Sequence, residues 1–187
     1  MSTILSIFRN TRISSICILP TFLIIMSGCS SPTYSPIRTE SAVDIDRFMG
    51  DWYVIACIPT FIETKAYNAL ESYERGPENR IHTTFTFNKG SFDGPQKKYT
   101  PTGFIGEDPS NAVWGMQFVW PIKAEYRIVH VDDSYSQTII GRSKRDYVWI
   151  MARQPAIPDE EYNKLVQIVE EQGYDISQLR KVPQQGN

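Results

Sequence analysis

Cysteine and histidine are the residue types that most often serve as nucleophiles, proton carriers and metal ligands. The chain contains three cysteines, Cys17, Cys29 and Cys57, and two histidines, His82 and His130. Two histidines leave little material for a histidine-based site, so no metal is expected. No known catalytic motif places a histidine beside Cys57, so we predict no catalytic residue.

Cys29 points to a different chemistry, because the residues before it form an export signal. Arg9 and Arg12 precede the apolar run Ile13–Met26, in which Pro20 and several polar residues occur. This run is shorter than the roughly 20 apolar residues of a membrane-spanning helix. Met26-Ser27-Gly28-Cys29 resembles the lipobox of bacterial lipoproteins, in which the cysteine is acylated and becomes the mature N-terminus. We therefore expect residues 1–28 to be a lipoprotein signal peptide.

An acylated Cys29 would hold the mature protein on a membrane. Each buried methylene contributes about 0.8 kcal/mol, so two or more acyl chains anchor a protein almost permanently. Ser30 rather than Asp follows the cysteine, and by the same resemblance this implies the bacterial outer membrane. Residues 29–44 are expected to form the acylated N-terminus and an extended tether, and residues 45–187 the folded domain. The alternatives are an uncleaved membrane anchor and cleavage by the ordinary signal peptidase with Cys29 left free.

Composition favours one globular domain and excludes several function classes. The chain has 187 residues, of which 41% are hydrophobic and 21% charged, with a net charge of −2. Because no block of like charges occurs, nucleic acid is not expected as a partner. Loss of Cys17 and acylation of Cys29 would leave Cys57 without a partner, so the domain must fold without a disulfide.

The folded domain has the pattern of an antiparallel β protein followed by one helix. Runs rich in aromatic and β-branched residues recur about every ten residues, separated by Gly, Pro, Asn and Asp. The expected strands are Trp52–Ile58, Tyr67–Glu74, Arg80–Asn88, Tyr99–Ile105, Val113–Val119, Glu125–Val131, Ser136–Gly141 and Tyr147–Arg153. After Pro158, apolar residues at helical spacing from Tyr162 to Val169 predict an amphipathic helix of about 14 residues that ends at Gly173.

Three short motifs at fixed places among these strands resemble those of the lipocalin family. Gly50-Asp51-Trp52-Tyr53 opens the first strand, Asp133-Ser134-Tyr135 lies at the turn before the seventh, and Arg153 closes the eighth. With the lipobox, the chain looks most like the bacterial outer-membrane lipoprotein lipocalins. The resemblance implies an all-β fold, an eight-stranded antiparallel up-and-down barrel with one C-terminal α-helix packed outside.

The same resemblance implies structural roles for Gly50, Trp52, Asp133, Tyr135 and Arg153. In the family the motif tryptophan packs across the closed end of the barrel, and the motif arginine lies over its ring. A guanidinium on an indole face contributes about 0.5–2 kcal/mol. The second motif is usually Thr-Asp-Tyr, and Asp133-Ser134-Tyr135 departs from that order.

Strand parity and the likeness to lipocalin pockets indicate an apolar, aromatic barrel interior. The residues expected to bind ligand are Val54, Ala56, Trp114, Met116, Phe118, Tyr126, Ile128, Tyr147, Trp149 and Met151. Such a pocket favours an acyl chain, and binding needs no cofactor. Lys97, Lys98, Lys123 and Arg127 lie near strand ends and could hold a phosphate or carboxylate.

Parity also places the reactive side chains. Cys57 alternates with Ala56 and should point away from the cavity, whereas His130 shares the parity of Tyr126 and Ile128 and should enter the barrel. His82 is expected on the exposed face of its strand.

Together these features predict a lipid-anchored lipocalin that binds an amphipathic lipid, either a fatty acid or a lysophospholipid. The resemblance implies lipid storage or transport and outer-membrane maintenance. The expected partners are this ligand and the membrane through Cys29, and a homodimer is left open. The alternatives are a carrier of a rigid hydrophobe such as a tetrapyrrole, sterol or retinoid, a barrel enzyme that uses Cys57 or His130, and a filled barrel that binds a partner protein.

Overall fold

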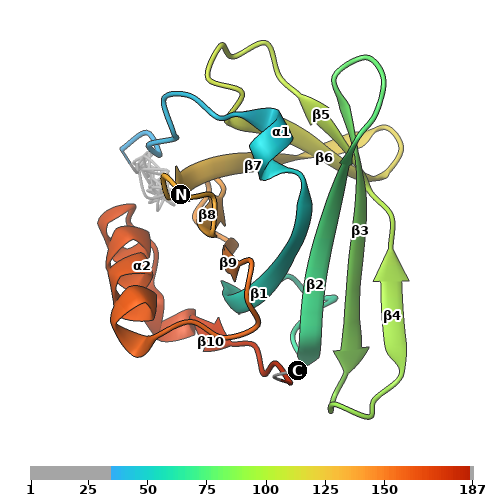
Figure 1. Cartoon of the computed structure of the whole chain (residues 1–187), viewed down its shortest axis with the longest axis vertical. Coiled ribbons are helices and arrows are strands. Elements are labelled where there is room, and N and C mark those ends of the chain that lie inside the picture. The colour runs from blue at the N-terminus through green and yellow to red at the C-terminus, as the bar shows by residue number, and fades with distance from the viewer. Residues whose placement is uncertain (1–34, 186–187) are drawn as a thin grey trace, which may run out of the picture. The chain divides into compact units, whose positions relative to one another are not determined.

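A computed structural model of the chain describes residues 35–185, all of which belong to one compact unit (Figure 1). The expected signal peptide and Cys29 lie outside the described residues. The expected tether is described from Ser35 onwards, and there it packs against the domain, with Ile37 and Val43 buried. No helix among residues 35–185 has the length and apolarity needed to span a membrane.

The strands form one antiparallel sheet that closes on itself, because β1 pairs with both β2 and β9. The strands of the barrel are β1 (Gly50–Ile58), β2 (Ala66–Arg75), β3 (Arg80–Lys89), β4 (Gln96–Tyr99), β5 (Thr102–Ile105), β6 (Val113–Val119), β7 (Ile122–Val131), β8 (Gln137–Gly141) and β9 (Val148–Ala152). Both β4 and β5 pair with β3 and occupy one strand position. The predicted eight-stranded antiparallel barrel is therefore confirmed.

Pro101 divides the strand that the sequence predicts over Tyr99–Ile105. Proline has no backbone N–H to donate, so the ladder is interrupted between β4 and β5. The Pro101 carbonyl still accepts a hydrogen bond from the Thr83 amide at 3.2 Å. The two short strands thus remain in register on β3.

Helix α2 (Asp159–Glu171) covers one flank of the barrel, close to the predicted length (Figure 1). It buries Leu165 and Val169 in a cluster with the outward side chains of β8 and β9, which are Ile139, Val148 and Ile150. The chain then passes through the short 3-10 helix η1 (Ile176–Gln178) to β10 (Arg180–Lys181), which pairs with β1. This cluster lies outside the barrel and is separate from the interior core.

A short helix that the sequence did not predict, α1 (Ile45–Phe48), precedes β1. The Asp44 carboxylate caps it by accepting hydrogen bonds from the Asp46 and Arg47 amides. Phe48 is fully buried in the interior core. The helix therefore places an aromatic plug at one end of the barrel.

Two β-bulges reverse the side-chain alternation that the sequence suggests. Pairing shifts in β1 between Val54 and Ala56, which places Ala56 in the outer cluster and Cys57 in the interior core. In β7 the shift falls between Ile128 and His130. The predicted inward positions of Ala56 and His130, and the outward position of Cys57, are therefore wrong, because one extra residue in a strand exchanges the two faces.

Up-and-down connectivity gathers the loops at two opposite ends. The segments 44–51, 74–80, 106–112, 132–136 and 153–154 lie at the closed end, and the segments 59–65, 89–98, 117–125 and 142–147, here called the mouth loops, lie at the open end. The N-terminal segment runs between the two ends. The Ser35 carbonyl accepts from Arg145 at the mouth, and the Val43 amide donates to Ser110 at the closed end.

Candidate functional site

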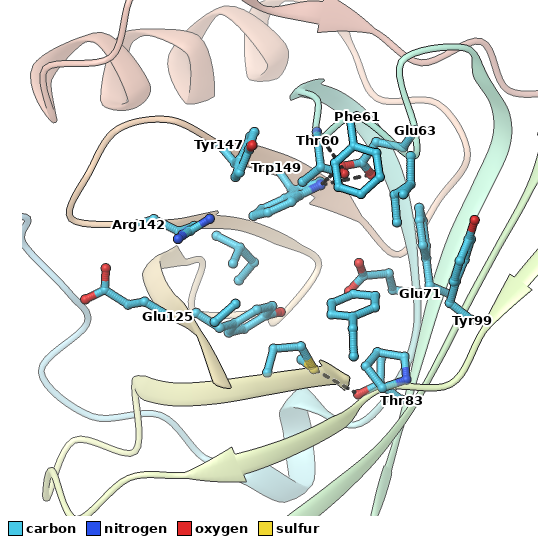
Figure 2. Close-up of a pocket in the computed structure, with 18 of the residues that line it drawn as sticks. Thr60, Phe61, Glu63, Glu71, Thr83, Tyr99, Glu125, Arg142, Tyr147 and Trp149 are labelled. Atoms are coloured by element: carbon cyan, nitrogen blue, oxygen red, sulfur yellow. Dashed lines mark hydrogen bonds between the residues drawn. The ribbon is translucent and has the colours of Figure 1, made fainter. Parts of the chain in front are cut away.

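A cavity of about 400 Å³ occupies the open half of the barrel (Figure 2). It lies among side chains from most of the barrel strands and from the loop between β1 and β2. The lining residues are Thr60, Phe61, Ile62, Glu63, Glu71, Thr83, Phe85, Tyr99, Pro101, Met116, Phe118, Val119, Ala124, Glu125, Tyr126, Ile140, Arg142, Tyr147, Trp149 and Met151. Most of these side chains are apolar or aromatic, so the cavity suits a hydrophobic ligand.

Aromatic packing forms the floor beneath this cavity. The Trp114 and Tyr126 rings stack at 5.2 Å with an interplanar angle of 14°. Phe48 packs against Trp52 at 5.1 Å and meets the Trp114 ring edge-on at 5.6 Å. The Trp114 indole N–H donates to the Asn111 carbonyl at 2.7 Å, so its polar atom is satisfied. These rings fill the closed half of the barrel and confine the cavity to the open half.

The motif residues meet below this floor. The Arg153 guanidinium carbon lies 3.7 Å from the centre of the Trp52 ring. A side chain at Gly50, which has φ of +91°, would contact Arg153 at 3.4 Å. Arg47 links to the second motif, since it covers the Tyr135 ring at 4.2 Å and donates to the Asp133 carbonyl at 2.7 Å.

Six of the ten residues predicted to bind ligand line the cavity. They are Met116, Phe118, Tyr126, Tyr147, Trp149 and Met151. Val54, Trp114 and Ile128 face the interior but belong to the packed core. Ala56 lies outside the barrel because of the bulge in β1. The space above Trp52 is occupied by the side chains of Phe48 and Tyr73, so it does not belong to the cavity.

A half-buried carboxylate, Glu71 of β2, lines the cavity and was not predicted. Its side chain accepts from the Tyr73 hydroxyl, which lies 2.7 Å from the Tyr126 hydroxyl. Burial raises the pKa of Glu71 to about 7, against the opposing effect of the Tyr73 hydrogen bond. Polar and apolar residues alternate irregularly in β2 around a pairing shift between Tyr67 and Leu70, so its inward face could not be read from the sequence.

A second carboxylate, Glu63, lies in the loop between β1 and β2 and is only 3% exposed. It accepts from the Thr60 amide and hydroxyl, each at 2.9 Å, and from the Trp149 indole at 3.2 Å (Figure 2). Burial raises its pKa, although these hydrogen bonds oppose the shift. Glu63 thereby fixes the Trp149 ring in the cavity wall.

Among residues 35–185, Arg142 is the one cation that lines the cavity, and it comes from the mouth loop that follows β8. Its guanidinium carbon lies 5.2 Å from the Tyr147 ring centre, and Nη1 lies 3.4 Å from an Asp146 carboxylate oxygen. Its Nε is buried and has no hydrogen-bond partner within the described residues. The four cations expected to meet a head group, Lys97, Lys98, Lys123 and Arg127, do not line the cavity.

The reactive side chains lie away from the cavity. Cys57 is buried, and burial with the nearby Glu63 charge raises its pKa to about 12. His130 pairs with Ile139 of the outer cluster, and its Nδ1 lies 3.4 Å from Glu40. His82 is exposed, as predicted. Among residues 35–185 no three His, Cys, Asp or Glu side chains are grouped to hold a metal ion.

Comparison with known proteins decides the family. The lipocalin-like domain matches residues 43–184, a stretch that includes the whole barrel, α2 and β10. The chain belongs to the lipocalin family. The matched region contains Trp52, Arg153 and all the residues that line the cavity.

This lipocalin resembles proteins from a plant and a bacterium. It is 29% identical over 160 residues to Temperature-induced lipocalin-1 of Arabidopsis thaliana. The aligned region covers 79% of this chain and 83% of that protein. It is 28% identical over 172 residues to Outer membrane lipoprotein Blc of Escherichia coli (strain K12), covering 89% and 93% respectively.

Solved structures share the fold of this lipocalin at low identity. Insecticyanin from the tobacco hornworm Manduca sexta matches with a TM-score of 0.64 at 13% identity, covering 80% of this chain and 85% of that chain. Lobster apocrustacyanin A1 matches with a TM-score of 0.62 at 12% identity, covering 83% and 93%. At these identities the likeness concerns the fold alone.

Proposed function

We propose that this lipocalin holds one amphipathic lipid, a fatty acid or a lysophospholipid, with the acyl chain inside the barrel. The observation that carries the proposal is the cavity of about 400 Å³ with its apolar and aromatic lining. Ligand pockets commonly have volumes of about 300–1,000 Å³. Each methylene removed from water contributes about 0.8 kcal/mol, so the tail supplies most of the affinity.

The head group would lie at the mouth, beside Arg142. An arginine beside an apolar cavity pairs with phosphate or carboxylate through two parallel hydrogen bonds. The unpartnered Nε of Arg142 supports this role, because a buried donor without an acceptor is costly. Asp146 is the competing acceptor, at 3.4 Å.

The membrane location is part of the same proposal. Acylation of Cys29 would tether the barrel to the outer membrane, and the name of the Escherichia coli relative supports that location. A carrier held beside a bilayer would store or transfer lipids of that membrane and so maintain it. The ligand-binding residues in this proposal are the six predicted lining residues together with Arg142.

Binding rather than catalysis is favoured by the positions of the two candidate nucleophile and acid-base groups. Neither Cys57 nor His130 lines the cavity. The thiol of Cys57, with its pKa near 12, remains protonated at neutral pH. A lipid in the cavity would therefore meet neither group.

The proposal is tested with the fragment Ser30–Asn187, which contains the whole compact unit that forms the barrel. The delipidated fragment is titrated with fatty acids and lysophospholipids while tryptophan fluorescence is recorded. We expect a saturable one-site change that disappears in Trp149→Phe, because Trp149 lines the cavity. A response to sterols, retinoids or tetrapyrroles but to no acyl ligand would assign the cavity to a rigid hydrophobe instead.

A further inference from the structure

The exposed apolar side chains of the barrel gather at its mouth. Among residues 35–185 the large hydrophobic residues that are exposed are Phe61 (86%), Phe118 (51%), Val119 (68%), Trp120 (81%) and Ile122 (69%). Phe61 belongs to the loop between β1 and β2, and the other four surround the turn between β6 and β7. Both loops border the cavity, so the apolar rim and the interior lining are continuous.

Charge is also divided between the two ends of the barrel. The mouth loops contain eight basic residues, Lys65, Lys89, Lys97, Lys98, Lys123, Arg142, Lys144 and Arg145, and four acidic residues, Glu63, Asp93, Glu125 and Asp146. The closed-end segments contain nine acidic residues, Asp44, Asp46, Asp51, Glu74, Glu78, Glu107, Asp108, Asp132 and Asp133, and four basic residues, Arg47, Arg75, Arg80 and Arg153. A negatively charged surface would therefore attract the mouth and repel the closed end.

The chain enters the domain at this same end. The Ser35 carbonyl accepts from an Arg145 guanidinium nitrogen at 2.7 Å, and Arg145 belongs to a mouth loop. Cys29 precedes Ser35 by six residues in the sequence. Six residues span at most about 20 Å, so an anchor at Cys29 keeps the mouth end near the membrane.

We propose that the mouth loops dock on an anionic lipid bilayer, with Trp120 and Ile122 inserted among the lipid head groups and the cavity opening toward the lipids. Aromatic and aliphatic side chains ringed by lysine and arginine are typical of surfaces that bind this interface. Docking rests on the proposed function only for the anchor at Cys29. It adds a route by which a lipid enters the cavity without crossing water.

The proposal is tested by floating the fragment Ser30–Asn187 with vesicles of equimolar phosphatidylglycerol and phosphatidylcholine. We expect binding that weakens with salt and is far weaker to pure phosphatidylcholine. The variants Trp120→Ser with Ile122→Ser, and Lys65→Glu with Lys144→Glu, should each lower the partition coefficient at least about tenfold. None of the four substituted residues lines the cavity. The fatty-acid affinity of both variants, measured without vesicles, should therefore equal that of the wild type.

Arg75→Glu with Lys164→Glu is the matched control, because it changes the net charge equally at exposed sites away from the mouth. Equal loss of vesicle binding in this control, or no vesicle binding by the wild-type fragment, would overturn docking. If the fragment binds fatty acids but not vesicles, docking is refuted and the proposed function stands. If it binds vesicles but no acyl ligand, the proposed function is refuted and docking stands. If the wild-type fragment self-associates but does not bind vesicles, and the double variant Trp120→Ser with Ile122→Ser is monomeric, the apolar rim would instead be a homodimer interface.

Trp120 supplies a direct readout of insertion. It is the highly exposed member of the four tryptophans, whereas Trp52 and Trp114 are buried and Trp149 is half-buried. Brominated lipids in the same vesicles should quench emission from the wild-type fragment. Equal quenching of the Trp120→Phe variant would show that another tryptophan responds and would contradict the proposed orientation.

Discussion

Arg153 and Trp52 form a cation–π pair in which the guanidinium carbon lies 3.7 Å from the indole ring centre. The same guanidinium donates to the carbonyls of Arg47, Met49 and Asp51, each at 2.8 Å. The Trp52 indole N–H donates to the Phe48 carbonyl at 2.8 Å, so both partners hold α1 against the barrel. The pair thus stabilises the closed end by joining β9, α1 and β1.

Replacing Arg153 should destabilise the fold without weakening ligand binding. Arg153→Met removes the cation–π contact and leaves several carbonyls without a donor, so we expect the free energy of unfolding to fall by about 2–4 kcal/mol. Denaturant unfolding of the fragment Ser30–Asn187 measures this change. Arg75→Met, which removes only an exposed ion pair, should cost less than about 1 kcal/mol. Equal losses in the two variants would contradict a special role for Arg153.

Glu71 should make stability depend on pH. Its pKa rises from the ordinary 4.5 to about 7 in the folded protein, so between these values the folded state keeps a proton that the unfolded state releases. The free energy of unfolding therefore declines as pH rises through this window and levels off above pH 7, by about 3 kcal/mol in all. Glu71→Gln should remove most of that decline. Parallel pH curves for the variant and the wild type would show that Glu71 is not responsible.

Arg142 should discriminate between ligands by their head groups. Arg142→Gln removes the charge beside the cavity, and a hydrogen bond to a charged group contributes about 1.5–3 kcal/mol. We expect fatty-acid and lysophospholipid affinity to fall about tenfold or more, while a long-chain alcohol binds equally well to both forms. Titrations with matched chain lengths measure the two effects. A uniform loss across charged and neutral ligands would indicate damage to the cavity wall instead.

Narrowing the cavity should reduce lipid binding without unfolding the barrel. Ala124 lines the cavity near the mouth and is only half-buried, so Ala124→Trp has room to fold while its ring obstructs an acyl chain. Affinity for long-chain ligands should fall at least about tenfold, since several methylenes lose their contacts. Ala42→Trp, at an exposed site, serves as the control. Unchanged affinity in Ala124→Trp would place the ligand outside this cavity.

Cys57 should be inert in the folded protein. It is the only cysteine in the fragment Ser30–Asn187, and its buried thiol has a pKa of about 12. A thiol reagent should therefore label it only after denaturation, and Cys57→Ala should leave acyl-ligand affinity within about two- to threefold of wild type. Rapid labelling of the native fragment would instead support the enzyme alternative.

The pattern of the sequence was sufficient for the barrel, because turn residues and alternating strands such as Ile81–Phe87 agree with the observed pairing. It was insufficient where a strand departs from regular pairing. The bulges near Ile55 and Val129 shift the alternation without any proline or glycine to mark them. Strand parity predicts whether a side chain faces the interior, but it does not predict how far along the barrel axis that side chain lies. Parity therefore predicts Trp114 in the cavity, whereas its ring lies in the floor.

Long-range contacts explain the remaining omissions from the site. Glu63 and Arg142 come from loops, where alternation has no meaning, and each reaches the cavity through the packing of neighbouring strands. Glu71 could not be assigned to either face of its strand from the sequence, because neither face of Tyr67–Glu74 is cleanly apolar. Its burial depends on Tyr73 and on Tyr126, which is 53 residues away from Tyr73 in the chain.

Because of the bulge in β1, side chains of this strand belong to both the interior core and the outer cluster. From Val54 to Ile58 every side chain is buried, with Cys57 facing the interior and Ile55, Ala56 and Ile58 lying in the cluster beneath α2. One strand therefore serves as the shared wall of two cores. Removing α2 would expose one side of that wall to water, so the helix is a fixed part of the scaffold.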